Sequence, residues 1–169
     1  MSRTVELVCD DRLDAAVRGV WARLAGAGVR SLAGHPHPTN RPHVTLAECA
    51  AFPPGSAASL EAALAALPIQ VRLDRLLTLG GRSKVVALAV APDAALTGLQ
   101  AAVHAALAAG GCPAIFDPAR WVPHVSLTRR LDPARAGEAL AALAGLPPIE
   151  GALVAARSYD SVTRTVTPL

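Results

Sequence analysis

The chain has few aromatic and few charged residues, and each shortage excludes a class of protein. Aromatic residues make up 3% of the 169 residues, too few for a surface that binds single-stranded nucleic acid by stacking many bases. Charged residues make up 17% and hydrophobic residues 52%, so the composition predicts a folded chain and excludes a disordered one. The formal net charge of +3 permits a phosphate-bearing ligand without requiring a nucleic acid.

Lysine is almost absent, since Lys84 is the only one and every other basic residue is arginine. Arginine suits phosphate oxygens because its planar guanidinium donates two parallel hydrogen bonds. A general bias in residue usage explains the same pattern, because no cluster of arginines stands out along the chain.

Cysteine is scarce and long apolar runs are missing. Cys9, Cys49 and Cys112 are an odd number without metal-ligand spacing. The first two lie in apolar, strand-like runs, where we expect buried thiols in a reducing compartment. No signal peptide precedes the first expected strand, and no apolar stretch is long enough to cross a bilayer. We therefore expect a soluble, cytoplasmic protein with no membrane partner.

The length fits one domain covering residues 1–169, and no linker rich in Pro, Gly or Ser divides it. The periodicity of apolar residues predicts alternating strands and helices. Strands are expected at 4–9, 43–49, 69–79, 85–90, 124–129 and 149–159, and helices at about 13–24, 56–67, 96–107 and from 133 onward. In the first strand Val5, Leu7 and Cys9 share one face, while Thr4 and Glu6 occupy the other.

Helix starts are marked by Asp10-Asp11 and by Asp132-Pro133, because aspartate caps the N-terminus of a helix and proline suits its first position. The two halves of the chain then match. His43 and His124 are 81 residues apart (124 − 43 = 81), and the strand residues around Val5 repeat at the same offset around Val86. Each half, about 3–80 and 84–160, has the order β-α-β-α-β. We expect an α+β fold, bilobal with pseudo-twofold symmetry, built of mainly antiparallel sheets with a central groove.

The same short motif occurs in both halves, as Pro-His-Val-Thr-Leu at 42–46 and Pro-His-Val-Ser-Leu at 123–127. Residues two apart on a strand share a face, so His43 and Thr45 point one way, as do His124 and Ser126. Each half thus presents an imidazole beside a hydroxyl. If the halves pack about a twofold axis, the two pairs face each other across one groove.

This arrangement favours cleavage of a phosphodiester by paired acid–base catalysis. A neutral imidazole accepts a proton from water or from a ribose hydroxyl, and a protonated one donates a proton to the departing oxygen. Hydroxyls donate to the non-bridging oxygens, where negative charge develops. Such a site needs no metal ion and no cofactor, and either histidine can be the base.

The doubled His-x-(Thr/Ser) motif in a duplicated β-α-β-α-β chain resembles the 2H phosphoesterase superfamily, in particular its bacterial 2'-5' RNA ligase-like branch. The resemblance covers nearly the whole chain. It implies metal-independent hydrolysis of 2',3'-cyclic phosphates of RNA ends or nucleotides, with ligation by the reverse chemistry in some members. His43 and His124 match its catalytic positions, and Thr45 and Ser126 match its phosphate-binding positions.

The resemblance also implies a phosphate-binding arginine five residues after the second histidine, where Arg129 stands. Strict alternation along the strand from His124 would instead turn Arg130 toward the groove. A bulge or a strand end decides between the two. The first half has Glu48 at the equivalent place, so we expect an asymmetric groove.

Three further residues are candidates for the substrate groove. Arg41 shares the face of His43, but an exposed loop arginine is an equal reading. His37 lies in a proline-rich loop with His35, and the two lack a third metal ligand at suitable spacing. Trp121 precedes the second motif, where it either stacks on a base or anchors strand to helix. We expect a monomer that binds a nucleotide or an RNA end.

Two other functions fit the same fold. One is a phosphodiesterase that acts on ADP-ribose cyclic phosphate or on RNA 3' ends. The other is a nucleotide- or RNA-binding module with little turnover. Intact histidines and hydroxyls in both motifs argue against the binding module.

Overall fold

The computed structural model describes residues 2–169 of the chain. Its strands are Arg3–Cys9 (β1), His43–Cys49 (β2), Ile69–Leu79 (β3), Val85–Val90 (β4), His124–Ser126 (β5), Ile149–Asp160 (β6) and Thr165–Pro168 (β7). Its α-helices are Asp11–Gly26 (α1), Ser56–Leu64 (α2), Ala94–Leu107 (α3) and Pro133–Ala142 (α4).

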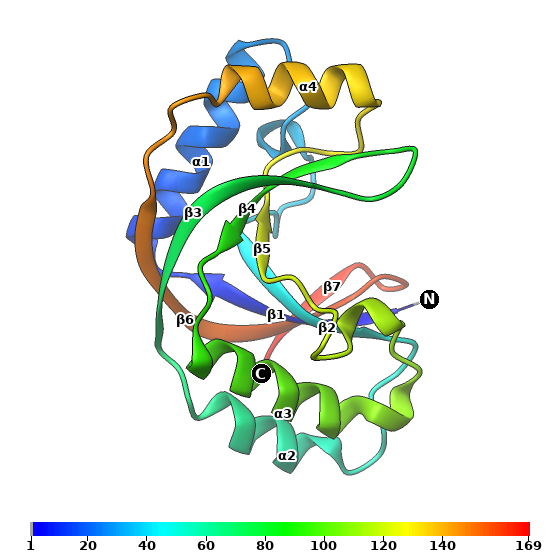
Figure 1. Cartoon of the computed structure of the whole chain (residues 1–169). Helices are drawn as coiled ribbons and strands as arrows, with labels where there is room; N and C mark the ends of the chain where they lie inside the picture. The colour runs from blue at the N-terminus through cyan, green and yellow to red at the C-terminus, as the bar shows by residue number, and fades with distance from the viewer. Residues whose placement is uncertain (1) are drawn as a thin grey trace.

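The strands form one antiparallel sheet that closes on itself like a barrel (Figure 1). Their order is β1-β2-β5-β4-β3-β6-β7, and β6 also pairs with β1. Closure depends on the length of β6, which has 12 residues. Its first part pairs with β3 and its later part pairs with β1. The fold is therefore a mixed α/β fold with one closed antiparallel sheet, which agrees in part with the expected α+β fold of mainly antiparallel sheets.

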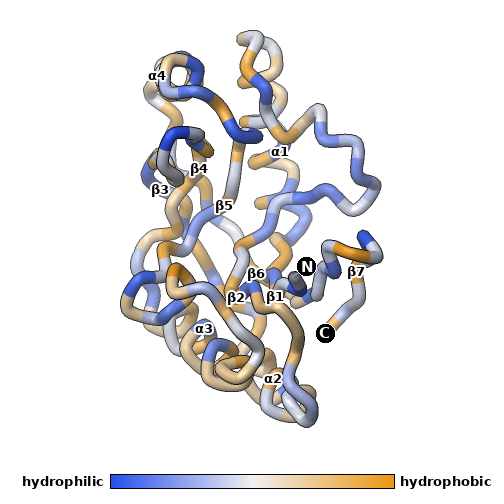
Figure 2. Tube along the Cα trace, turned by 90° about the vertical axis from the view of Figure 1, so that its right-hand side faces the viewer, coloured by the Kyte–Doolittle hydropathy of each residue, from blue (hydrophilic) through white to orange (hydrophobic). Residues whose placement is uncertain are grey.

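The helices pack in two pairs on either side of the strands. α1 lies with α4 and α2 lies with α3 (Figure 1). Figure 2 shows β2 and β5 between the two pairs, through the middle of the molecule. Each pair takes one helix from each half of the chain. No helix in residues 2–169 is both long and apolar enough to cross a membrane.

Most expected elements are confirmed, but two end earlier than expected and one strand was not expected. α2 ends at Leu64 and not at 67, β5 ends at Ser126 and not at 129, and β7 was not predicted. The order of the elements is β1-α1-β2-α2-β3 followed by β4-α3-β5-α4-β6, which is the expected order. The twofold relation between the halves stays a prediction.

β5 is short because its ladder with β4 becomes irregular after Ser126. The backbone amides of Leu127 and Thr128 both donate to the Val86 carbonyl, at 2.9 and 3.3 Å. The Thr128 hydroxyl then accepts a hydrogen bond from the Val86 amide at 3.0 Å. The Thr128 side chain thus replaces the next backbone acceptor of the ladder. The chain therefore leaves the sheet just before Arg129 and Arg130.

The expectation of a buried thiol is confirmed at Cys9 and wrong at Cys49. Cys49 and Cys112 form a disulfide, and Cys9 is a buried free thiol. The expectation of a buried thiol at Cys49 is wrong because α3 packs against β2 and brings the chain after that helix to the end of the strand. Burial raises the pKa of the Cys9 thiol to about 12, so it stays protonated.

Candidate active site

The two motifs come together on adjacent strands. β2 and β5 are antiparallel neighbours, and the central valines of the two motifs pair with each other. Residues that flank such a pair face each other in reverse order, so His43 stands opposite Ser126 and Thr45 stands opposite His124. Directly opposed side chains lie about 5 Å apart at Cβ, and diagonal ones about 7 Å. The four side chains therefore form one compact cluster.

Each imidazole is held by the backbone two residues before it. Nδ1 of His43 lies 2.8 Å from the Arg41 carbonyl oxygen, and Nδ1 of His124 lies 2.7 Å from the Val122 carbonyl oxygen. A carbonyl oxygen only accepts, so Nδ1 carries the hydrogen in both rings. In the neutral ring Nε2 is then the proton acceptor, and in the charged ring it is a donor.

The two imidazoles differ in their surroundings. Burial lowers the pKa of His124 below the ordinary value of 6.5, the hydrogen bond to the Val122 carbonyl opposes this, and the charge of His43 adds to the lowering. His43 instead has Oε1 of the buried Glu6 at 3.8 Å from its Nε2. The cluster is thus asymmetric in charge.

The hydroxyl-bearing residues are positioned through their backbone by the two tryptophans. The Trp121 indole donates to the Thr45 carbonyl at 2.9 Å, and the Trp21 indole donates to the Ser126 carbonyl at 3.1 Å. Neither hydroxyl hydrogen bonds to another residue within the described chain, so both remain available to a ligand. Trp121 is thus bonded to β2 through its indole nitrogen, and its part in the substrate groove stays a prediction.

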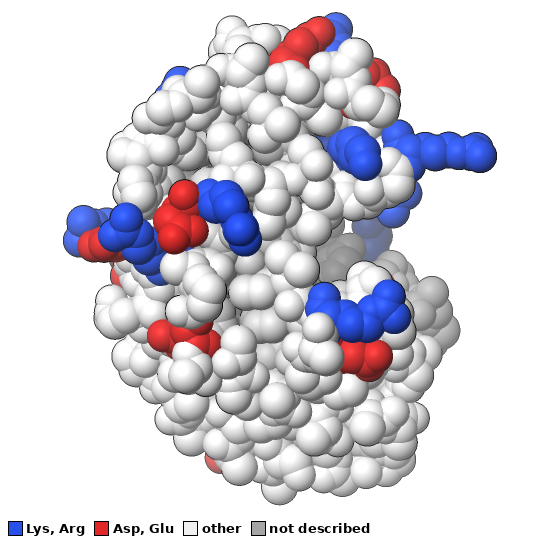
Figure 3. Space-filling model, viewed as in Figure 1, with Lys and Arg blue, Asp and Glu red and all other residues white. Residues whose placement is uncertain are grey.

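A cavity of about 410 Å³ opens beside the second motif. It lies between β5 and the β3–β4 hairpin, and its lining residues are Leu79, Gly80, Gly81, Ser83, Val85, His124, Ser126 and Arg130. The space-filling view is hollowed on its right-hand side, with Lys and Arg side chains above and below the hollow (Figure 3). This part of the surface is suited to an anion.

The structure separates Arg130 from Arg129. Arg130 lines the cavity with His124 and Ser126, whereas Arg129 lines a separate cavity of about 290 Å³ that also contains Arg30. The Arg129 amide donates to the Arg30 carbonyl at 3.1 Å, which fixes the chain in that direction. Of the two arginines, Arg130 is the one next to the second motif.

Two of the other candidates are engaged elsewhere. Arg41 lies 3.3 Å from the Asp14 carboxylate of α1 and donates to the Cys9 carbonyl at 3.1 Å. These contacts fit a role in holding the loop before β2. His37 packs edge-on against Tyr159, with 5.7 Å between ring centroids. Neither residue lines the cavity of His124.

Sequence analysis missed Glu6 as a member of the site. Glu6 is only 5% exposed and lies opposite Thr45 across the β1–β2 ladder. Its position on the face opposite Val5 and Leu7 was visible in the sequence. Its proximity to His43 was not, because that depends on the register of the two strands.

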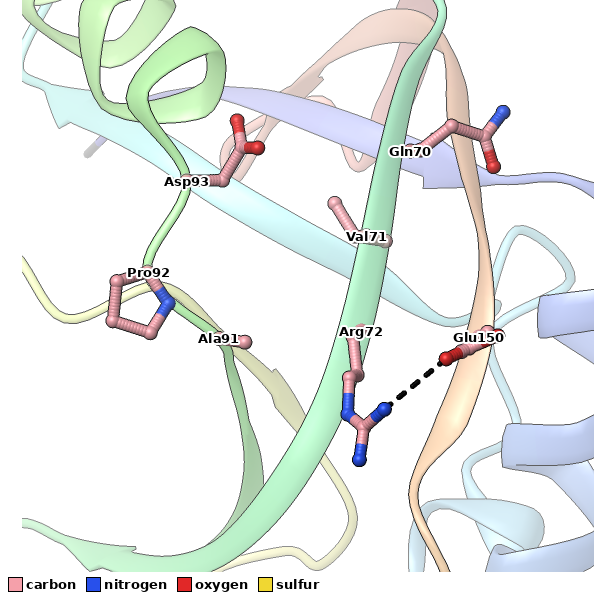
Figure 4. A pocket seen from close by; sticks show the side chains of 7 residues that line it. All are labelled: Gln70, Val71, Arg72, Ala91, Pro92, Asp93 and Glu150. Carbon is pink, nitrogen blue, oxygen red and sulfur yellow. Dashed lines mark hydrogen bonds and ion pairs between the residues drawn. The ribbon is translucent and has the colours of Figure 1, made fainter.

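Other features of the surface do not include the motif residues. A cavity of about 280 Å³ lies around Arg72 and Glu150, whose side chains pair at 3.2 Å (Figure 4). Its lining contains neither histidine nor either hydroxyl. Within residues 2–169, no three His, Cys, Asp or Glu side chains are grouped as metal ligands.

The two histidines lie on adjacent strands, each with a hydroxyl residue two positions further on, so the fold brings together the two motifs on which the resemblance to the 2H phosphoesterases was based. The sequence profile of the 2'-5' RNA ligase superfamily matches residues 10–157. The chain therefore belongs to this superfamily, and the resemblance found in the sequence is confirmed. Membership supports an enzyme of the phosphodiesterase type with a role in RNA processing.

Solved structures with the same fold include Usb1 from Kluyveromyces marxianus. It is 13% identical, with a TM-score of 0.54 over 99% of this chain and 98% of that one. A second Usb1 structure, with uridine monophosphate, has the same identity and TM-score over 99% and 97% of the two chains. At this identity the likeness shows the fold alone. No curated protein sequence matches the chain.

Proposed function

We propose that this protein hydrolyses the 2',3'-cyclic phosphate of an RNA end or a nucleotide, with His43 and His124 as the acid–base pair. The observation that supports this most directly is that both imidazoles make the same hydrogen bond to the backbone. Both donate from Nδ1 to a carbonyl two residues earlier, and both keep Nε2 for chemistry. Phosphodiester hydrolysis needs two such groups, one to accept a proton and one to donate it.

The proposed reaction balances as follows in protons and bonds. One neutral imidazole accepts a proton from water at Nε2 while the water oxygen bonds to phosphorus. The bond from phosphorus to one ribose oxygen breaks, and the protonated imidazole donates its Nε2 proton to that oxygen. The product is a phosphomonoester on the other ribose oxygen. Proton exchange with solvent restores both rings.

Negative charge develops on the non-bridging oxygens during this reaction. The free hydroxyls of Thr45 and Ser126 are placed beside the imidazoles and can donate hydrogen bonds to these oxygens. Arg130 takes the role of phosphate contact in place of Arg129, because it shares the cavity of His124 and Ser126. These groups supply both proton transfer and charge stabilisation, so the proposal requires no metal ion.

The test is turnover of the four 2',3'-cyclic nucleotides and of a short RNA with a cyclic phosphate end, in EDTA, with products identified by phosphorus NMR. Wild-type protein should turn over at least one of them. His43→Ala and His124→Ala should each reduce kcat about 100-fold or more, the ordinary contribution of a general acid or base. Circular dichroism should show both variants folded.

The matched control is His104→Ala. This histidine lies on α3 and pairs with Asp117 at 3.3 Å, outside the motif cluster, so its loss should leave turnover unchanged. Activity that disappears in EDTA and returns with zinc would contradict the metal-independent mechanism. Failure of the wild type on every cyclic phosphate would contradict the substrate.

A further inference from the structure

A buried carboxylate lies on the floor of the motif cluster. The Glu6 side chain is 7% exposed, and a carboxylate is seldom buried unless it is paired. It is paired on both oxygens. Oε2 accepts from Nε of Arg157 on β6 at 2.8 Å, and Oε1 accepts from the Thr4 hydroxyl at 2.8 Å. These bonds hold the carboxylate in one orientation.

The same Oε1 lies 3.8 Å from Nε2 of His43. This distance exceeds that of a hydrogen bond, but it is short enough for strong attraction between opposite charges. Glu6 can therefore stabilise a positively charged His43 without capturing the Nε2 proton. The proton stays available to a leaving oxygen in the groove.

The strand register shows that His124 lacks a corresponding carboxylate. Across the sheet, Glu6 faces Thr45, the hydroxyl residue of the first motif. The second motif's Ser126 faces Ala87 on β4, and Ala87 is at the same offset of 81 from Glu6 (87 − 6 = 81). Within the described chain, no carboxylate lies within 4.0 Å of the His124 ring nitrogens. The two halves thus differ by one charge at equivalent places.

The remaining charges around the two rings agree with this asymmetry. His43 is faced by Glu6 from β1 and by His124 from β5, with Arg157 behind Glu6. His124 is faced by His43, and Arg130 lines its cavity. Burial lowers the pKa of His124, which favours its neutral form.

We propose that Glu6 is a positioning residue that keeps His43 protonated, so that His43 is the general acid and His124 the general base. This inference depends on the proposed function. His124 Nε2 accepts the proton of the attacking water, and His43 Nε2 donates its proton to the ribose oxygen that leaves phosphorus. Glu6 contacts neither the attacking water nor the leaving ribose oxygen, and it acts through the charge on His43.

The pH dependence of kcat/KM tests the assignment, because each limb of the bell reports one histidine. The acid limb reports His124, which must be neutral. Burial lowers the pKa of His124, so the acid limb should lie below the ordinary value of 6.5. The alkaline limb reports His43. In Glu6→Gln the alkaline limb should move to lower pH, because the negative charge 3.8 Å from Nε2 of His43 is removed, while the acid limb stays in place.

The matched control is Glu150→Gln, an exposed carboxylate on β6 that pairs with Arg72, and it should move neither limb. Glu6→Gln leaves the buried Arg157 with the Thr39 carbonyl but without an oppositely charged partner, and can unfold the protein. The double variant Glu6→Gln/Arg157→Gln removes both charges. Its alkaline limb should also move to lower pH, because the carboxylate is the charge nearer to His43. A folded variant with an unmoved alkaline limb, or with a moved acid limb, overturns the assignment.

A second measurement needs no substrate. Two-dimensional NMR of the histidine rings should show His43 losing its proton at lower pH in Glu6→Gln than in the wild type. Absence of turnover together with this shift would contradict the proposed function and support the coupling of Glu6 to His43. Turnover without the shift would support the function and overturn the role of Glu6.

Discussion

At the two histidines, the ring nitrogen bound to the backbone determines what the other nitrogen can do. In both His43 and His124, Nδ1 donates a hydrogen bond to the carbonyl oxygen of the residue two positions earlier. This bond fixes the tautomer and the ring orientation before any substrate binds. The motif supplies the bond locally, because the acceptor lies within the same short segment as the ring. Contacts from other parts of the fold make the two rings different, since Glu6 of β1 lies beside His43 and burial lowers the pKa of His124.

Arg129 and Arg130 are adjacent in the chain but line different cavities, so replacing each in turn tests which one contacts the phosphate. Arg130→Ala should raise KM and lower kcat/KM about 10- to 100-fold, because it removes a charged hydrogen-bond donor from the cavity of His124. Arg129→Ala should change kcat/KM less than threefold, because Arg129 lines another cavity. Steady-state kinetics on a cyclic nucleotide measures both. The reverse ranking would return the phosphate contact to Arg129.

At the scale of elements, Asp10 joins the start of α1 to β6. Its Oδ1 accepts from the Leu13 amide at 2.7 Å, as expected of an N-cap, and its Oδ2 accepts from the Ala152 amide at 2.9 Å. Gly151 permits this close approach, since a Cβ there would lie 2.6 Å from the Leu13 Cβ. The cap was predictable from its sequence, but the bond to β6 was not.

Loss of this side chain should therefore cost more than loss of an ordinary cap. Asp10→Ala should lower the free energy of unfolding by about 2–3 kcal/mol, because it removes a helix cap and also leaves the partly buried Ala152 amide without its acceptor. Asp132→Ala removes only the cap of α4, where Oδ1 accepts from the Arg135 amide at 2.9 Å, and should cost about 1 kcal/mol. Denaturation in urea measures both. Equal losses would show that the bond to β6 adds nothing.

At the scale of the whole molecule, closure of the sheet and the disulfide connect distant parts of the chain. Cys49 and Cys112 are separated by 63 residues and join the end of β2 to the segment after α3. A cross-link across a loop of this length stabilises by about 4 kcal/mol in the chain-entropy description. The expectation of a cytoplasmic protein stays a prediction.

Reduction should accordingly lower the Tm by several degrees, which differential scanning calorimetry with and without reductant would measure. Cys49→Ser/Cys112→Ser is the control, because its Tm should be low and insensitive to reductant. A thiol assay in denaturant without reductant should find only Cys9 free. A count of three free thiols would contradict the disulfide.

The sequence by itself determined the features that depend on neighbours along the chain. Helices and strands follow from apolar spacing, the caps at Asp10 and Asp132 from short-range hydrogen bonding, and the matched motifs from strand parity. The tertiary structure decided what depends on contacts between distant residues. Arg157 reaches Glu6 across 151 positions, and the strand end after Ser126 separates Arg130 from Arg129. Periodicity is a local signal, whereas register, sheet closure and the pairing of charges are properties of the folded chain.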